Sequence, residues 1–150
     1  MVLQAPTETL RQILIVDDST DDADLTREGF QRSPHDVELH HVLDGKECMK
    51  FLRKDGEYRK APAPDLVLLD LNMPNMDGRE VLAAIDKDPI LRRLPVIVLT
   101  TSNAEMDRLT TYALGCNSYI VKPSTLESLE KFVRELCSYW FATVVLPPKI

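Results

Sequence analysis

The chain has 150 residues, of which 44% are hydrophobic, and a formal net charge of -6. This length is enough for one globular core but hardly for two, so we expect a single domain. The acidic balance, with no basic run longer than the pair Arg92 and Arg93, argues against nucleic acid or an anionic membrane as a partner.

The cysteines and the N-terminus indicate where the protein resides. The three cysteines are odd in number and lack C-x-x-C spacing, so neither a disulfide framework nor a zinc site is expected. They fit a reducing cytoplasm. The first residues, "MVLQAPTETLRQ", lack the apolar core of a signal peptide, and no apolar run approaches the roughly 18 residues that span a bilayer. We therefore expect a cytoplasmic protein that does not contact a membrane.

The first predicted elements are a buried strand and a helix. In "QILIVDD" the apolar run 13–16 is too short for a helix, is rich in β-branched residues and ends in acids, which indicates a strand buried on both faces. A helix should follow, capped by Ser19 or Thr20 and ending near Ser33 and Pro34. The chain then continues with "VELHHV" as a strand and "DGKECMKFLRKDGEY" as a helix.

Three further cycles of strand and helix complete the pattern. The strands are expected in "PDLVLLD", "LPVIVLTTS" and "NSYIVKPS", and the helices in "GREVLAAIDKD", "AEMDRLTTYALG" and "TLESLEKFVRELCSYW". Five units in strict alternation predict an α/β fold, a doubly wound parallel (βα)5 sheet of flavodoxin-like strand order 2-1-3-4-5. We expect an N-terminal extension over residues 1–11, the domain over 12–140 and a C-terminal tail over 141–150.

Polar residues stand at the carboxyl ends of four predicted strands, where open α/β sheets bind their ligands. Strand one ends in Asp17 and Asp18, strand three in Asp70, strand four in Thr100, and strand five in Lys122. Each alone has an ordinary explanation as a helix cap, a turn acceptor or a solvated lysine. All of them together at one edge of the sheet are much harder to explain in that way.

Three carboxylates in one small volume disfavour one another's ionisation, so a positive group is expected among them. A hard divalent cation, Mg²⁺ before Ca²⁺, would bind one or two carboxylates and leave room for a phosphate oxygen. The Lys122 ammonium adds a second positive charge, and Thr100 adds a hydroxyl. Such a set is what phosphoryl transfer to a carboxylate nucleophile requires.

The combination of "VDD", "LLDLNMPNMDG", "VLTTS" and "YIVKP" resembles the receiver domain of two-component response regulators over almost the whole chain. The resemblance implies that Asp70 accepts a phosphoryl group from a sensor histidine kinase. It implies that Mg²⁺, with Mn²⁺ as a substitute, is bound by Asp17, Asp18, Asp70 and the backbone carbonyl of Asn72. It also implies that Lys122 contacts the phosphoryl oxygens, that Thr100 and Tyr119 form a switch, and that the bond before Pro123 is cis.

The last residues carry two further expectations. The chain ends shortly after the fifth helix, so we expect its output to be a protein contact. Clustered aromatic and aliphatic residues in "CSYWFATVVLPPKI" either pack on their own domain or form a homodimer interface, and we favour the interface. Its residues would be Tyr139, Trp140, Phe141, Val144 and Leu146. The ending is similar to that of the regulators partnered with bacterial and cyanobacterial phytochromes, which would make the kinase a red-light photoreceptor.

Particular residues of this chain argue against three other classes of protein. A haloacid-dehalogenase-type phosphatase wants a second acid two residues after its nucleophile, where this chain has Asn72. A flavodoxin-like cofactor binder wants a phosphate loop after strand one, and "DDSTDDAD" is too acidic for one. A degenerate receiver that only binds partners would not need the complete set of acids, threonine and lysine. His40 and His41 are adjacent on a strand and point to opposite faces, so they do not form one metal site. We therefore expect a signalling phosphoacceptor rather than an enzyme.

Overall fold

The structure is a computed structural model that describes residues 10–149, and its centre is a single sheet of five parallel strands. The strand order is β2-β1-β3-β4-β5, which confirms the predicted flavodoxin-like topology. The strands are β1 (Arg11–Val16), β2 (Val37–Val42), β3 (Leu66–Leu69), β4 (Val96–Thr100) and β5 (Ser118–Val121).

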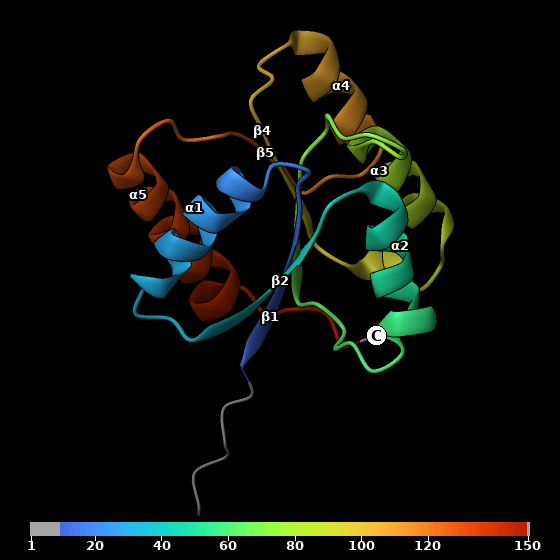
Figure 1. Ribbon diagram of the computed structural model, residues 1–150, viewed down its shortest axis with the longest axis horizontal. Coiled ribbons are helices and arrows are strands. Elements are labelled where there is room, and N and C mark those ends of the chain that lie inside the picture. The colour runs from blue at the N-terminus through green and yellow to red at the C-terminus, as the bar shows by residue number, and fades with distance from the viewer. Residues whose placement is uncertain (1–9, 150) are drawn as a thin grey trace, which may run out of the picture.

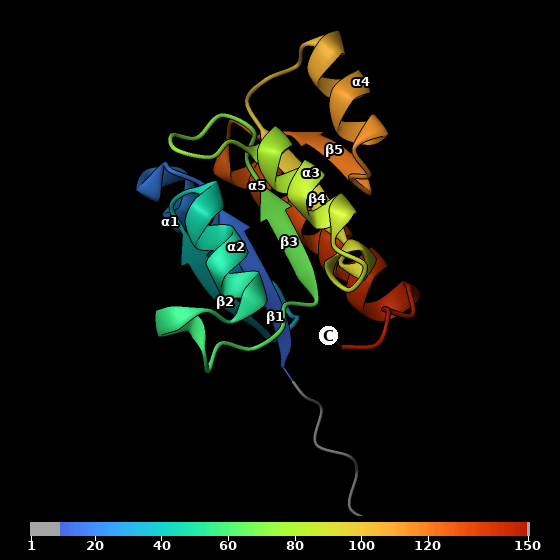
Figure 2. The same ribbon diagram turned by 90° about the vertical axis from the view of Figure 1, so that its right-hand side faces the viewer.

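Helices cover both faces of the sheet (Figure 1). One face carries α1 (Thr20–Gln31) and α5 (Leu126–Cys137). The other carries α2 (Gly45–Arg53), α3 (Gly78–Lys87) and α4 (Glu105–Ala113); in Figure 2, α2 and α3 stand in front of the strands and α4 lies above β5. Short helical segments lie at Gly56–Tyr58, Leu91–Arg93 and Ser138–Thr143. Between residues 10 and 149, no helix has the length and apolar character needed to cross a bilayer.

The two layers of helices explain why the central strands are apolar without interruption. Successive side chains of a strand point to opposite faces of the sheet. Leu14 and Val16 of β1 belong to the core on the α2 and α3 side, whereas Ile13 and Ile15 belong to the core on the α1 and α5 side. β3 and residues 96–99 of β4 alternate in the same way, so each of these positions needs an apolar side chain.

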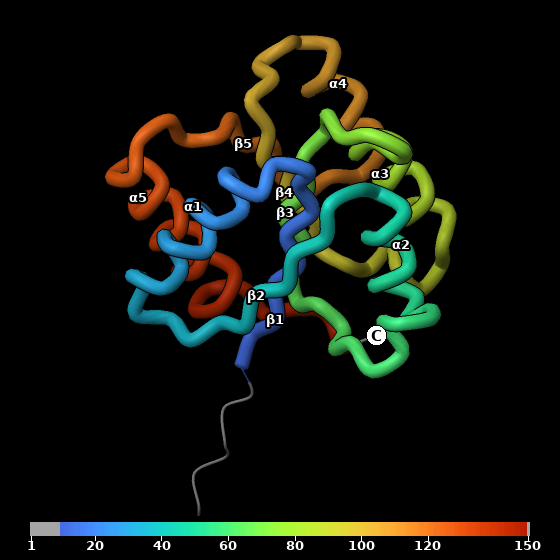
Figure 3. Tube along the Cα trace, in the orientation of Figure 1, coloured from blue at the N-terminus to red at the C-terminus, as the bar shows by residue number. Residues whose placement is uncertain are grey.

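Helix caps fix where the chain turns after each strand. Side-chain oxygens of Ser19, Asp44 and Asp77 accept backbone N–H groups in the first turns of α1, α2 and α3. Thr125 and Ser128 form a reciprocal capping box at the start of α5. Each such cap stabilises its helix by about 1 kcal/mol. The loops that follow β1 and β3, residues 17–19 and 70–77, therefore end in capped helices and lie at the carboxyl edge of the sheet, toward the top of Figure 3.

Two local expectations are wrong. All peptide bonds between residues 10 and 149 are trans, including the bond before Pro123 that was expected to be cis. An X–Pro bond differs by only about 0.5–1 kcal/mol between its isomers, so the residue type alone does not decide between them. The second difference is at the end of α5, where a helix was expected to run through "CSYW" and the tail to begin at residue 141, but the α-helix ends at Cys137. Ser138–Thr143 instead continues as a π-helical turn, supported by a hydrogen bond from Thr143 Oγ1 to the Ser138 carbonyl of 3.0 Å.

The C-terminal segment returns along its own domain. Trp140 and Phe141 are half-buried against the core on the α1 and α5 side. The end of the segment lies at the amino edge of the sheet, at the bottom of Figure 1, where Lys149 Nζ is 3.0 Å from Asp65 Oδ1 and 2.9 Å from the Ala63 carbonyl. Residues 1–9 of the expected N-terminal extension lie outside the described residues. Part of the tail therefore packs on its own domain, through Trp140 and Phe141, while Val145 is 94% exposed and could contact another chain.

Candidate functional site

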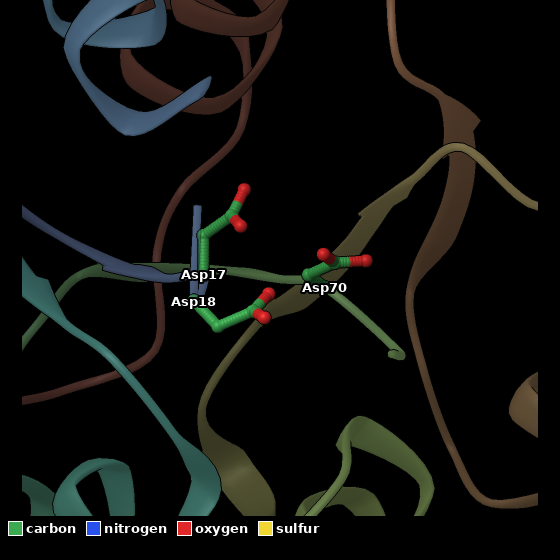
Figure 4. Close-up of side chains that lie close together, drawn as sticks. All are labelled: Asp17, Asp18 and Asp70. Carbon is green, nitrogen blue, oxygen red and sulfur yellow. The ribbon is translucent and has the colours of Figure 1, made fainter. Parts of the chain in front are cut away.

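Three carboxylates meet at the carboxyl ends of β1 and β3. Asp17 and Asp18 follow the last residue of β1, and Asp70 follows the last residue of β3. The sheet ladder continues into them, because the Asp70 N–H donates to the Val16 carbonyl at 2.9 Å. One oxygen from each carboxylate lies within 4.8 Å of the others. Figure 4 shows the three side chains side by side. The adjacency of β1 and β3 thus joins acids that are 52 or 53 positions apart.

Lys122 neutralises part of this charge. It follows β5, and its own N–H donates to the Thr100 carbonyl at 2.8 Å, which fixes the lysine backbone beside β4. Its ammonium nitrogen lies 2.8 Å from Asp17 Oδ2, 3.3 Å from Asp70 Oδ2 and 2.8 Å from Asp22 Oδ2. Asp22 comes from the first turn of α1. One ammonium is therefore shared by three carboxylates, and Asp18 adds a fourth carboxylate to the same site.

The pKa values in the site reflect burial and pairing. Burial raises the pKa of Asp17, and this effect exceeds the opposite effects of the bonds from Lys122 and the Ser19 N–H. Burial alone would lower the pKa of Lys122, but its hydrogen bonds to Asp17 and Asp22 and the nearby negative charges raise it above the ordinary value. Lys122 therefore remains a cation at any physiological pH.

The donor set fits a hard divalent cation. All three clustered groups are carboxylates, which are the preferred ligands of Mg²⁺, Mn²⁺ and Ca²⁺. Asp17 and Asp70 are buried, and each uses one oxygen to accept a neighbouring backbone N–H, from Ser19 and Leu71 respectively. Asp18 is exposed, and within residues 10–149 no donor hydrogen-bonds to its carboxylate. The cluster thus combines two fixed acids with one that is open to a ligand, and one lysine does not balance its charge.

A hydrogen-bonded path leads from β4 and β5 to α3 and α4. Thr100, at the end of β4, is fully buried, and its hydroxyl accepts the Ser102 N–H at 3.4 Å. The Tyr119 hydroxyl donates to the Ser102 carbonyl at 2.9 Å. The Ser102 hydroxyl donates to Asp107 at 2.5 Å, and Asp107 pairs with Arg79 of α3. The loop after β4 is therefore tied to both neighbouring helices and to Tyr119.

The turn after β3 is tightly packed. A Cβ atom added to Gly78 would lie 2.3 Å from the Asp70 carbonyl oxygen and 2.8 Å from the Leu71 Cα. The Gly78 N–H donates to the Leu71 carbonyl at 2.9 Å. The first residue of α3 therefore supports the backbone of Asp70, and only glycine fits there without displacing it. Asn72 lies in this turn with an exposed side chain.

Sequence reasoning missed two contacts of the site. The first is the ion pair between Asp22 and Lys122. An acid in the first turn of a helix is already stabilised by the helix dipole, so nothing in the sequence assigns Asp22 a partner. His41 was rejected as a metal ligand, and its Nε2 lies 2.7 Å from the Asp17 carbonyl oxygen, so it touches the backbone of the site instead. No local sequence signal distinguishes either residue, because each contact forms between elements that only the sheet order brings together.

Comparison with known proteins gives a family. The response regulator receiver domain matches residues 13–134. Among curated proteins, the chain is 47% identical to response regulator Rcp1 of Synechocystis sp. over 135 residues, which is 90% of this chain and 92% of that protein. The region matched includes all of the carboxylates, Thr100 and Lys122.

Solved structures agree. The phosphorylated cyanobacterial phytochrome response regulator RcpA is 44% identical, with a TM-score of 0.88 over 93% of this chain and 100% of that one. The Mn²⁺-bound form of response regulator Rcp1 is 46% identical, with a TM-score of 0.84 over 92% of this chain and 99% of that one. The fold, the cluster of acids at the strand ends and these matches lead to one conclusion: the chain belongs to the response regulator receiver domain family.

Proposed function

We propose that this protein is a phosphorylation-controlled switch in which Asp70 accepts a phosphoryl group from a sensor histidine kinase. The observation that carries the proposal is the convergence of Asp17, Asp18 and Asp70 with the Lys122 ammonium at one edge of the sheet. A carboxylate oxygen of Asp70 forms the new bond to phosphorus while the bond between phosphorus and the donor nitrogen breaks, and the electron pair of that bond goes to the imidazole.

Each residue of the site has a separate role in the proposed phosphoryl transfer. Asp17, Asp18 and Asp70, with the carbonyl of Asn72, would hold Mg²⁺ or Mn²⁺. When bound, this cation neutralises charge on the phosphoryl oxygens. Lys122 holds a positive charge beside Asp70 Oδ2, where the phosphoryl charge develops. Gly78 keeps the backbone of Asp70 in place. The protein in this scheme promotes only its own phosphorylation and dephosphorylation.

The switch would run through Thr100 and Tyr119. The Thr100 hydroxyl would move to the phosphoryl group, and Tyr119 would leave the Ser102 carbonyl to which it now donates. Because Ser102 also binds Asp107 of α4, a change at Thr100 reaches the surface of that helix. Phosphorylation would thereby change the contacts that the α4 and β5 surface makes with other proteins.

Incubation with acetyl phosphate and Mg²⁺, followed by intact mass spectrometry, tests the proposal. We expect one acid-labile phosphoryl group per chain, which does not form when the metal is chelated before acetyl phosphate is added and does not form in Asp70→Asn. Asp86→Asn, which removes an exposed acid in the last turn of α3, is the control and should be labelled normally. Labelling that survives in Asp70→Asn would overturn the proposal.

A phytochrome is the kinase that we propose. The support is the similarity to RcpA, which is described as a cyanobacterial phytochrome response regulator. The test offers the protein to a phosphorylated phytochrome histidine kinase and to an unrelated histidine kinase under identical conditions. Transfer from the phytochrome should be faster than transfer from the unrelated kinase and should depend on Asp70, whereas equal rates would contradict this assignment.

We also propose that the tail contributes to a homodimer. The support is the exposure of Tyr139 (55%) and Val145 (94%), while Trp140 and Phe141 are half-buried in their own chain. Val144 and Leu146 are half-buried and remain candidates for the same interface. Light scattering should show weaker self-association for the variant that carries both Tyr139→Ser and Val145→Ser. Ile90→Ser, at a similarly exposed residue outside the tail, should not change the mass. An unchanged mass in the tail variant would leave these residues without a role in a dimer.

A further inference from the structure

Three carboxylates already surround the Lys122 ammonium. An ammonium carries three N–H donors, and within residues 10–149 that of Lys122 lies 2.8 Å from Asp17, 2.8 Å from Asp22 and 3.3 Å from Asp70, with hydrogen bonds to Asp22 and Asp70. The shortest distances are to Asp17 and Asp22, and the longest is to the proposed phosphoacceptor. A phosphoryl group on Asp70 would bring additional charged acceptor oxygens to the ammonium, so it would compete with Asp17 and Asp22 for the N–H donors of Lys122.

Asp17 is poorly suited to release the lysine. It is buried, it continues the sheet ladder through its backbone N–H group, and its Oδ1 is fixed by the Ser19 N–H. Moving this carboxylate would break a hydrogen bond in a buried place, which costs about 1–3 kcal/mol for the unpaired group.

Asp22 is better suited to release the lysine. It lies on α1 rather than at a strand end, and its side chain is 44% exposed, so water can replace the ammonium at its carboxylate. Within residues 10–149, its carboxylate accepts a hydrogen bond from Lys122 and from no other group. The cap of α1 does not depend on this carboxylate, because Ser19 binds the backbone N–H of Asp22.

We propose that Asp22 is a positioning residue that holds Lys122 before phosphorylation and competes with the phosphoryl group for its ammonium. The inference rests on the proposed function of Asp70. Asp22 touches none of the reacting atoms and acts only through the lysine. It therefore opposes the binding of an anionic phosphodonor, and its removal favours phosphorylation.

The experiment compares neighbouring acids of the same helix turn. Asp22→Asn should raise the rate of phosphorylation at low acetyl phosphate about three- to fivefold, the upper range for an ion pair of this exposure. The gain should appear as a lower KM for acetyl phosphate, with the maximal rate changed less. Asp21→Asn removes the same charge one residue away, on a side chain that does not pair with Lys122, and should change the rate less than 1.5-fold by the screening expected for exposed charges. Asp22→Glu keeps a carboxylate within reach of the lysine and should behave as the parent protein.

A spectroscopic measurement tests the contact itself. In protein labelled with ¹⁵N-lysine, the ammonium resonance of Lys122 should move in Asp22→Asn and stay in Asp21→Asn. An unmoved resonance, equal rates in the two variants, or a slower rate in Asp22→Asn would each overturn the role of Asp22. Asp70→Asn is measured beside them: if it is still labelled, the proposed function fails. If it is not labelled while the two asparagine variants at 21 and 22 are equal, the inference on Asp22 fails alone.

Discussion

Replacing Gly78 by alanine tests how the site is supported, because the new methyl group would collide with backbone rather than with side chains. It would lie 2.3 Å from the Asp70 carbonyl oxygen and 2.8 Å from the Leu71 Cα, both far inside van der Waals contact. Backbone cannot rotate away, so the first turn of α3 or the loop after β3 must move. Such overpacking typically costs 1–3 kcal/mol, partly offset by the better helix propensity of alanine, up to about 1 kcal/mol.

Gly29→Ala is the matched control. Gly29 lies within α1, and an added Cβ there would meet the side chains of Leu129 and Val133 at 3.3 Å. These side chains can shift by a few tenths of an ångström, and alanine gains up to about 1 kcal/mol of helix propensity, so the stability should change by less than about 1 kcal/mol. The same chemical change is thus expected to have different effects at the two positions.

Urea unfolding followed by circular dichroism measures both variants. We expect a loss of about 1–3 kcal/mol in the unfolding free energy of Gly78→Ala. Labelling by acetyl phosphate should also slow, because the displaced carbonyl belongs to Asp70 itself. A Gly78→Ala protein as stable and as readily labelled as the parent would refute the claim that this turn fixes the phosphoacceptor.

The remaining predictions concern the tail, the thiols and the switch. Lys149→Met removes the exposed partner of Asp65 and should lower the unfolding free energy by no more than about 1 kcal/mol in a urea titration. Asp65→Ala should lower it by about 1–3 kcal/mol, because it also leaves the buried Gln12 N–H without an acceptor. Equal effects of the two changes would contradict this. Burial raises the pKa of the Cys48 thiol to about 12, so the folded state keeps its proton while the unfolded state loses it near the ordinary value of 9.0. The stability from this group is therefore complete below pH 9.0 and falls as the pH rises toward 12, by up to about 1.4 kcal/mol per pH unit, and Cys48→Ala should flatten that part of the pH profile. Tyr119→Phe loses the bond to the Ser102 carbonyl and should leave labelling of Asp70 intact while changing partner binding, measured by light scattering or pull-down of the kinase; unchanged binding would count against the switch.

Much of the architecture could be predicted from residue patterns. The uninterrupted apolar strands indicated a sheet covered on both faces, and the acids, threonine and lysine that follow them indicated a ligand site at the carboxyl edge. The location of the helix starts was also local information, because Ser19, Asp44, Asp77 and Thr125 cap the backbone within three residues of themselves. These features depend on the alternation of strand and helix patterns and on short-range hydrogen bonds, both of which are determined by residues close together in the sequence.

The tertiary structure decided what depends on separation in sequence. The pairing of Lys122 with Asp22 spans 100 positions, and that of Lys149 with Asp65 joins the tail to a loop before β3. The trans bond before Pro123 and the π-helical turn after α5 also depend on packing, because the local energy differences are small. The sequence by itself determined which groups stand at the strand ends. Only the folded sheet, by placing β1 between β2 and β3 and the first turn of α1 beside Lys122, decided which of them share one lysine.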